Sequence, residues 1–542
     1  MSYGKIYNVR KTSQREAIPG RKMTKNAAGG YAFAIDIWST LNRFLILGTE
    51  GGTYYVKERK LTLDNVEAVL KCLAEDGVRT VKEAVKVSQA GRAPKNEPAI
   101  FMLALAVKFG DNQTQDVALA EMPNVCRFGT HLFTFAQYLK DLDVTWSRKV
   151  RKAFERWYNM KPAQFAAYQV LKYQGRNVYE KDKSSRWTHA DILRLAHPKP
   201  ETSAHSAVFR YAIRGWEGVE IPELDQIAAF EAAKGASDEK SIVSLIHRYN
   251  LTREMVPTNW LNSTDVWAAL FEKMPMTAMV RNLGKMTQVG LIAQFSDVAK
   301  EVASRLADRE YIKKSRLHPM SVLKALRQYQ TGKSRNIVWS PNRQVVDALD
   351  NAFYLAFDNV EPTGKNIMLA LDVSGSMAWD SSQIPGMNMT ARVASSAMAM
   401  VTARAEPNYM TVAFTSGRGW GRYAVTELDI SPRERLDDVM RRVDGLYAGG
   451  TDCALPFLYA IKNKIPVDAV IIYTDNDSWA GDIHVTQAVK LYRQKMGRDV
   501  KLVACAMAAN TYSVADPQDP NQIDVVGFDT STPAAISEFI RG

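Results

Sequence analysis

Cysteine is scarce in this chain: only Cys72, Cys126, Cys453 and Cys505 occur among 542 residues. Their spacing excludes a zinc-finger pattern, and four cysteines in so long a chain form no disulfide framework, which favours a reducing compartment. Long apolar runs are also absent, since the longest, about 99–107, falls short of the roughly twenty residues of a membrane span. Residues 1–21 are polar and basic, without the apolar core of a secretory signal. We therefore expect a cytoplasmic protein with no membrane partner.

The composition is that of a folded protein, with 46% apolar and 24% charged residues. These fractions exclude a disordered or fibrous chain, and the length predicts two to four domains. The formal net charge is +12. An excess of this kind points to an anionic partner without identifying it.

The excess of positive charge lies entirely in the first two thirds of the chain. Residues 361–542 contain 17 Lys and Arg against 21 Asp and Glu, a net charge of −4, which leaves +16 on residues 1–360. A basic body is thus joined to an acidic C-terminal part. The division suggests two sites with different kinds of partner.

The basic body has a helical pattern from about residue 36 to 357. Apolar residues recur at three- and four-residue steps, for example Leu63, Val66, Val69, Leu70 and Leu73. Short breaks such as 75–77 and 91–94 separate the runs, which predicts irregular stacked helices in the manner of an α-solenoid. A helical domain without repeats is the alternative. Residues 1–25 have no periodicity and are expected to form a flexible basic arm.

A charged segment, 179–185, interrupts this pattern and is expected to be a surface loop. It would lie between a helix ending near Arg176 and a helix beginning near Thr188. Thr188 followed by Asp191 has the spacing of a helix N-terminus.

After residue 364 the pattern changes to alternating strands and helices. Strands are predicted at 366–373, 409–414, 467–473 and 501–507, with helices at 389–404, 433–443, 454–462 and 484–495. Strands that are apolar on both faces and alternate with helices indicate a doubly wound, mainly parallel α/β sheet. The predicted division of the chain is therefore an arm at 1–25, a helical domain at 26–361 and an α/β domain at 362–542.

Ligands of such sheets bind at the carboxyl ends of the strands, and oxygen-bearing residues gather there in this sequence. Asp372, Ser374 and Ser376 follow the first strand, Thr451 lies in a Gly-Gly-Thr-Asp loop, and Asp475 follows the third strand. Two carboxylates and three hydroxyls without His or Cys suit Mg²⁺, which retains water and leaves a position for an acidic partner. Loop capping by Ser and Asp is the alternative interpretation.

The five positions resemble the metal-ion-dependent adhesion site of the von Willebrand factor A domain, and the resemblance covers about residue 362 to the end. A hydrolytic metal site usually adds a base or a second metal. Only Asp452, Asp477 and His484 lie nearby in the sequence. The resemblance implies adhesion rather than catalysis.

The helical body contains stretches with more specific sequences. They are Ala28-Gly-Gly-Tyr31, 43–55, Thr130-His-Leu-Phe-Thr-Phe135, Leu193-Arg-Leu-Ala-His197 and 274–286, with 448–453, 515–517 and 527–529 in the C-terminal part. Together they resemble the TROVE module and A domain of the Ro ribonucleoprotein family, over nearly the whole chain. The charged segment 179–185 looks like an insertion relative to animal members, which suggests a bacterial or phage-borne member.

The resemblance implies a monomeric ring of HEAT-like helix pairs closed by the A domain. It implies that a Y-like noncoding RNA binds the outer surface, at positions corresponding to Lys172, Arg176 and His197. It also implies that the central hole holds single-stranded 3′ ends of misfolded RNAs, beside exoribonucleases such as polynucleotide phosphorylase. The insertion lies next to these positions in the sequence.

The residues themselves suit RNA. Lys172 and Arg176 are four apart, so on a helix both would reach the same side of a phosphate backbone, and His197 can stack or donate a hydrogen bond. Basic residues near aromatic ones suit single-stranded RNA, and the further candidates are Arg127, Lys140, Arg281 and Lys285. Ordinary solvated surface is the alternative for each of them. His131 is expected to be a core histidine.

Nucleotide hydrolysis is not supported, because neither Gly48-Thr-Glu-Gly-Gly52 nor Gly332-Lys-Ser334 completes a phosphate-binding loop. The favoured function is a noncatalytic RNA-binding scaffold. The alternatives are an A-domain adaptor for an ATPase or chelatase complex and a Mg²⁺-dependent nuclease.

Overall fold

The computed structural model describes residues 11–47, 58–173, 187–216, 224–334, 337–357, 360–378, 390–416, 425–508 and 510–542. The predicted RNA contact Arg176 and the predicted loop 179–185 lie outside these residues. None of the helices in the described part combines the length and the apolar character that crossing a bilayer requires.

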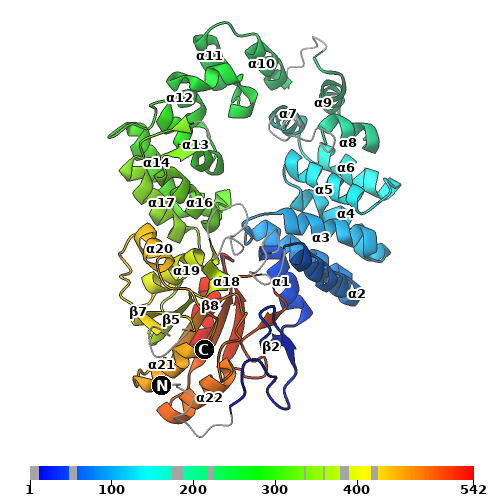
Figure 1. The fold of residues 1–542 in the computed structure, drawn as a ribbon. Helices are drawn as coiled ribbons and strands as arrows, with labels where there is room; N and C mark the ends of the chain where they lie inside the picture. Colours follow the sequence, from blue (N-terminus) through cyan, green and yellow to red (C-terminus); the bar gives the residue numbers. More distant parts are fainter. Residues whose placement is uncertain are drawn as a thin grey trace.

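Helices fill residues 37–357 and follow one another around a ring that the C-terminal domain closes (Figure 1). Their bounds are α1 (Ile37–Leu47), α2 (Glu58–Ala90), α3 (Glu97–Phe109), α4 (Asn112–Val125), α5 (Gly129–Asp141), α6 (Arg148–Asn159), α7 (Ala163–Lys172), α8 (His189–Ala196), α9 (Ser203–Arg214), α10 (Asp225–Lys234), α11 (Glu239–Tyr249), η3 (Arg253–Met255), η4 (Thr258–Asn262), α12 (Thr264–Glu272), α13 (Met276–Gln288), α14 (Asp297–Ala307), α15 (Arg309–Ser315), α16 (Pro319–Gln330) and α17 (Arg343–Leu355). The short strands β3 (Lys333–Ser334) and β4 (Ile337–Val338) form a hairpin before α17.

Each helix packs on the next helix of the chain or on one two or three helices away. Consecutive contacts join α1, α2, α3 and α4, and α4 contacts α6. Helix α6 contacts α8, and α8 contacts α9. Helix α7 joins α9 to α10, which is followed by α11 and α12. The far side of the ring continues from α13 to α16 and α17. The predicted irregular stack of helices is confirmed.

Local sequence explains where several of these helices begin and break. Thr188 and Asp191 form the predicted capping box at the start of α8, with the Thr188 N–H donating to Asp191 Oδ2 over 2.9 Å. The predicted break at 75–77 is a kink at Asp76, whose φ and ψ of −153° and 91° are non-helical. Gly77 is required there, because a β-carbon would lie 2.2 Å from the Thr114 hydroxyl oxygen of α4.

The C-terminal domain is a six-stranded sheet in the order β11-β9-β8-β5-β6-β7, parallel except for the edge strand β7. Its strands are β5 (Ile367–Asp372), β6 (Tyr409–Phe414), β7 (Val425–Leu428), β8 (Ala469–Thr474), β9 (Lys501–Ala506) and β11 (Gln522–Val526). Its helices are α18 (Gly375–Ala378), α19 (Ala391–Ala405), α20 (Leu436–Asp444), α21 (Leu455–Lys462), α22 (Val485–Met496) and α23 (Thr532–Arg541). The predicted doubly wound fold is confirmed.

Helices cover both faces of this sheet, which explains why its strands are continuously apolar. Ile367, Leu369 and Leu371 of β5 belong to the core that includes α19, α20 and the helical ring. Met368 and Ala370 belong to a second core with α21 and α22. The ring and one face of the sheet therefore share one continuous apolar core.

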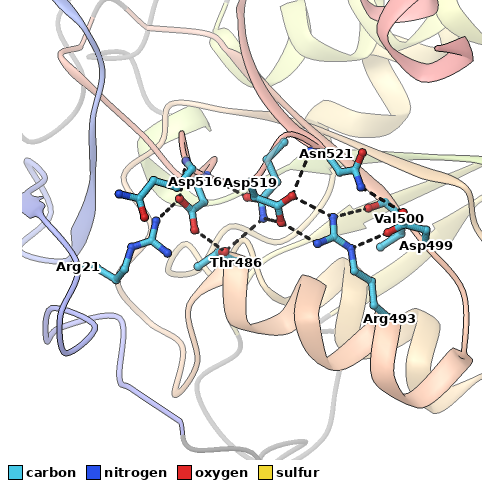
Figure 2. A network of polar contacts seen from close by, with 10 residues as sticks. Arg21, Thr486, Arg493, Asp499, Val500, Asp516, Asp519 and Asn521 are labelled. Carbon is cyan, nitrogen blue, oxygen red and sulfur yellow. Dashed lines mark hydrogen bonds and ion pairs between the residues drawn. The ribbon is translucent and has the colours of Figure 1, made fainter.

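The N-terminal segment is packed on the C-terminal domain from residue 11 onward, unlike the flexible arm expected over 1–25. Strands β1 (Met23–Lys25) and β2 (Tyr31–Ala34) form an antiparallel sheet with β10 (Tyr512–Ser513). Arg21 forms an ion pair with Asp516, which is 1% exposed (Figure 2). The segment is packed because single polar side chains such as Arg21 have specific partners in the C-terminal domain. Periodicity in the sequence does not reveal such partners.

Buried ion pairs connect the ring to the C-terminal domain. Arg43 of α1 is 1% exposed, donates to the Tyr512 carbonyl oxygen over 2.8 Å and pairs with Asp524. Arg92, after α2, pairs with Asp529. Both ends of the helical ring meet here, because His318 before α16 donates from Nε2 to the Arg92 carbonyl oxygen over 3.0 Å.

Candidate metal centre and nucleic-acid interface

The five predicted metal ligands come together at the carboxyl edge of the sheet. Strand β5 ends at Asp372, and the adjacent parallel strand β8 ends directly before Asp475. Ser374 and Ser376 follow β5, and their hydroxyl oxygens lie 3.1 Å apart. The Gly375 N–H donates to the Gly449 carbonyl oxygen over 2.8 Å, which brings the loop of Thr451 to the same place.

Hydrogen bonds orient both carboxylates. Asp372 accepts from the Ser374 N–H over 2.9 Å and from the Thr474 hydroxyl over 2.6 Å. Asp475 Oδ1 accepts from the Asp477 N–H over 3.0 Å. The motif spacing did not single out Thr474, although its place at the end of an apolar strand beside Asp475 is a signal that could have found it.

The two carboxylates are costly to bury together without a cation. Asp372 and Asp475 are 0% and 2% exposed. Burial raises the pKa of both, and the charge of Asp475 adds to the rise at Asp372. A cation between them would offset this repulsion.

Two buried oxygens at this place have no hydrogen-bond partner in the described residues: the Thr451 hydroxyl and Asp475 Oδ2. Buried polar atoms are nearly always hydrogen-bonded, so unpartnered ones call for a ligand, an ion or a water. Elsewhere in the described part, no group of three or more His, Cys, Asp or Glu side chains is placed to hold a metal. The donor set here, two carboxylates and three hydroxyls, fits a hard divalent cation.

The N-terminal segment holds the loops of this centre in place. Gln14, 1% exposed, donates from Nε2 to Asp452 Oδ1 over 2.8 Å and accepts from the Ser478 hydroxyl over 2.7 Å. The Ala27 N–H donates to Asp477 Oδ1 over 3.1 Å. Sequence reasoning missed Gln14, because its partners lie more than 430 residues away.

His484, the one histidine near the motif in sequence, is turned to the N-terminal segment. Its Nε2 lies 2.8 Å from the Glu16 carbonyl oxygen, and the residue caps the start of α22. The described geometry thus gives His484 a structural role.

The predicted RNA contacts lie on the helical ring, on different helices from one another and away from the metal ligands. Lys172 is the last residue of α7, half-buried, and its Nζ donates to the Tyr168 hydroxyl over 3.0 Å. Burial lowers the pKa of Lys172, but the bond to Tyr168, together with the charges of Tyr168, Tyr173 and Glu254, outweighs it and leaves the pKa raised. Helix α7 ends at Lys172, and the predicted contact Arg176 lies outside the described residues. His197 is exposed, in the left-handed conformation that ends α8.

The further RNA candidates differ in exposure. Arg127, before α5, is half-buried and donates from Nη1 to the Ser88 hydroxyl over 2.8 Å. Lys140 is exposed near the end of α5. Arg281 and Lys285 lie on α13, one turn apart, and the Lys285 Nζ donates to Asn262 Oδ1 over 2.9 Å.

Helix α6 carries a basic face that the sequence analysis did not single out. Its apolar side packs in the core, and five cations lie exposed on the other side: Arg148, Lys149, Arg151, Lys152 and Arg156. Lys149 pairs with Asp116 over 2.8 Å, and Lys152 lies 3.6 Å from Glu155. The density of Arg and Lys in 148–156 is a signal that could have found this face.

The chain is similar to two known domain families, one after the other. Residues 24–247 and 245–335 match the TROVE domain, and residues 366–540 match the Ro60 vWA domain.

Whole proteins show the same similarity. RNA-binding protein RO60 of Caenorhabditis elegans is 33% identical over 96% of this chain and 90% of its own length. RNA-binding protein RO60 of Deinococcus radiodurans is 35% identical over 98% of this chain and 97% of its own length. The crystal structure of the Deinococcus radiodurans RO (RSR) protein superposes with a TM-score of 0.68 at 34% identity, and the match covers 94% of this chain and all of that one.

Proposed function

Because this chain belongs to the Ro family of proteins, with a TROVE domain and a Ro60 vWA domain, we propose that it is a noncatalytic RNA-binding ring. The observation that carries the proposal is the near full-length similarity to two relatives that are named RNA-binding proteins. The net charge of +16 on residues 1–360 and the exposed cations of α6 support it, since phosphate contacts supply most of the affinity of such proteins.

We propose two kinds of RNA for the ring. A Y-like noncoding RNA binds the outer surface through Lys172, Arg176 and His197. Single-stranded 3′ ends of misfolded noncoding RNAs enter the ring, where exoribonucleases such as polynucleotide phosphorylase act beside it in the cytoplasm. The separate positions of Lys172, at the end of α7, and His197, at the end of α8, support a contact with a structured RNA rather than with one phosphate.

A gel-shift measurement tests the ring proposal. We expect a hairpin with a 3′ single-stranded tail to bind more tightly than the same hairpin with a blunt end, because only the tail can enter the ring. Equal affinity for both hairpins, or none for either, would contradict the proposal. Intact RNA after long incubation with Mg²⁺ is expected, and shortened RNA would favour the nuclease alternative.

Lys172→Ala tests the outer surface with a Y-like RNA as the probe. We expect weaker binding and a salt dependence shallower by about 0.9 in log–log slope, the contribution of one phosphate contact. Lys314→Ala, which removes an exposed cation of α15, is the matched control. Equal behaviour of the two variants would place the Y-like RNA elsewhere.

For the A domain we propose a resident Mg²⁺ that Asp372, Ser374, Ser376, Thr451 and Asp475 would hold. The buried oxygens of Thr451 and Asp475 that lack partners in the described residues support this. The bound ion would supply a cationic position for a carboxylate or phosphate of a partner. A domain of this kind also suits the alternative function as an adaptor for an ATPase or chelatase complex. If the wild-type protein binds neither hairpin in the gel-shift measurement, that alternative is favoured.

A further inference from the structure

The two ends of the helical ring meet at a seam between the loop after α2 and the loop after α15. The side chain of Arg316 runs along Gly91, where a β-carbon would lie 3.2 Å from Arg316 Cβ. Next to this contact, His318 donates to the Arg92 carbonyl oxygen over 3.0 Å. Residues far apart in the sequence therefore form one surface here.

Two arginines converge on the last turn of α2 at this seam. The Arg127 Nη1 donates to the Ser88 carbonyl oxygen over 3.1 Å, and Arg316 lies against Gly91, three residues further along. Burial lowers the pKa of Arg127 to about 10, and the neighbouring charge of Arg316 lowers it as well. In the described part of the chain, neither guanidinium group forms an ion pair with a carboxylate. Two like charges held together without an acid between them favour an anion.

An exposed aromatic residue, Phe128, directly follows Arg127 in the chain. Phe128 is 42% exposed, and its ring centroid lies 5.2 Å from that of His131 and 6.4 Å from that of Tyr173. The exposed part of an aromatic ring offers a stacking surface for a base.

A chain of hydrogen bonds runs from Arg127 to His131, whose ring lies next to that of Phe128. The Ser88 hydroxyl accepts from Arg127 over 2.8 Å and donates to Asn96 Oδ1 over 2.6 Å. Asn96 Nδ2 donates to the Val125 carbonyl oxygen over 2.8 Å and lies 3.4 Å from His131 Nδ1. These bonds fix Arg127 relative to His131, the ring next to Phe128, as a preorganised site requires.

We propose that Arg127, Phe128 and Arg316 form a seam platform that binds a short run of single-stranded RNA. A phosphate lies between the two guanidinium groups, and the adjoining base stacks on Phe128. Duplex RNA does not suit the site, because its bases are already stacked within the helix. The inference rests on the proposed binding of single-stranded RNA and adds to it the residues that contact the phosphate and the base. Since Arg127 and Arg316 come from opposite ends of the ring, bound RNA would also bridge the seam.

Fluorescence anisotropy with a labelled single-stranded 12-mer tests the platform in the full-length protein. Arg316→Ala should weaken binding about fivefold and reduce the log–log salt slope by about 0.7, the value for one phosphate of a single strand. Phe128→Leu keeps the apolar volume but removes the ring. It should weaken binding about tenfold, as expected for one stacked base, with the salt slope unchanged.

Two control variants match these changes. Lys314→Ala removes a neighbouring exposed cation, and Phe109→Leu removes another exposed ring, 53% accessible at the end of α3. Both should stay within about twofold of the wild type, in keeping with surface substitutions away from a site. If Lys314→Ala weakens binding as much as Arg316→Ala, or Phe128→Leu has no effect, the platform is wrong.

The failure of this inference is separable from the failure of the proposed function. Wild-type protein that binds the tailed hairpin, together with unchanged affinity of Arg316→Ala and Phe128→Leu, overturns the platform alone. Wild-type protein that binds no RNA overturns both. A duplex 12-mer that binds as tightly as the single strand would indicate contact with phosphates only and would exclude stacking on Phe128.

Discussion

At the scale of single residues, the most informative side chains are buried polar ones without partners. The Thr451 hydroxyl lies in the interior and makes no hydrogen bond to any described residue. It belongs to the same site as the carboxylates of Asp372 and Asp475, and burial raises the pKa of both. A buried hydroxyl without a hydrogen bond lowers the stability of the folded protein. A bound ligand or ion that contacts the Thr451 hydroxyl would explain why it is buried there. The same reasoning does not apply to His484, because its ring is bonded to the N-terminal segment.

Thr451→Val tests the metal proposal with a nearly isosteric change. In EDTA we expect a thermal midpoint equal to or above that of the wild type, because the hydroxyl makes no bond with a described residue. With Mg²⁺, the wild type should gain stability, by about 2.7 kcal/mol at a hundredfold excess over Kd, and the variant should gain much less. Differential scanning fluorimetry with and without Mg²⁺ measures both.

Asp297→Asn is the charge control, since that side chain is 97% exposed on α14. It should keep the full response to Mg²⁺. A Thr451→Val protein that responds to Mg²⁺ like the wild type would contradict the assignment of Thr451 as a ligand.

At the scale of elements, the N-terminal segment is an integral part of the C-terminal domain. Strand β2 pairs with β10, and Gln14 joins the loop of Asp452 to that of Ser478. Figure 2 shows how Arg21 extends a polar network in which Asp516, Thr486 and residues around Asp519 take part. Strand pairing, the buried side chains of Ala32 and Phe33 and a few buried polar bonds thus dock this segment.

Gln14→Ala should destabilise the protein by about 1–3 kcal/mol, because it leaves the buried carboxylate of Asp452 and the Ile483 carbonyl oxygen without this donor. Burial already raises the pKa of Asp452 to about 6, and the bond from Gln14 lowers it. Denaturant midpoints at pH 7.5 measure the loss. Lys22→Ala, an exposed position in the same segment, should be neutral; a loss of similar size there would point to the segment's charge instead.

At the scale of the whole molecule, three parts meet where the ring closes. Arg92 pairs with Asp529 of the C-terminal domain, while its carbonyl oxygen accepts from His318 at the start of α16. The same histidine accepts the Met320 N–H at Nδ1 over 3.1 Å, so its ring must be neutral to make both bonds. Closure of the ring therefore depends on an uncharged imidazole.

Acidification should weaken this closure over a defined range. Burial lowers the pKa of His318 to about 4, although the Arg92 carbonyl and the Asp529 carboxylate act in the opposite direction. The unfolded chain therefore takes up the proton first. The contribution of His318 to stability is complete above about pH 6.5, falls as the pH drops toward 4, and reaches a loss of about 3 kcal/mol at most.

His318→Gln removes this titration, so its denaturant midpoint should fall less than that of the wild type between pH 7.5 and pH 4.5. At pH 7.5 the variant should be the less stable protein, since it loses the helix cap. His247→Gln, on the exposed side of α11, is the control and should follow the wild type. Parallel pH profiles of His318→Gln and wild type would rule out the role of His318.

Much of the fold could be predicted from local pattern. The strand predicted at 409–414 is β6 to the residue, and Thr188 with Asp191 begins α8 as predicted. Periodicity and caps depend on neighbouring residues only, so one sequence is enough to recognise them. The edge strands β7 and β11 were missed, because a short, half-exposed strand has a weak apolar signal.

The sequence by itself determined the two-part architecture, the division of charge and the five oxygen-bearing positions at the sheet edge. Only the tertiary structure decided that residues 11–34 belong with the C-terminal domain, that α7 stops at Lys172, and that Arg127 and Arg316 both lie at the end of α2. The physical reason is the range of the interactions. Helices, strands and motif loops follow from residues a few places apart, whereas the seam and the polar bonds of Gln14 join residues separated by hundreds of positions.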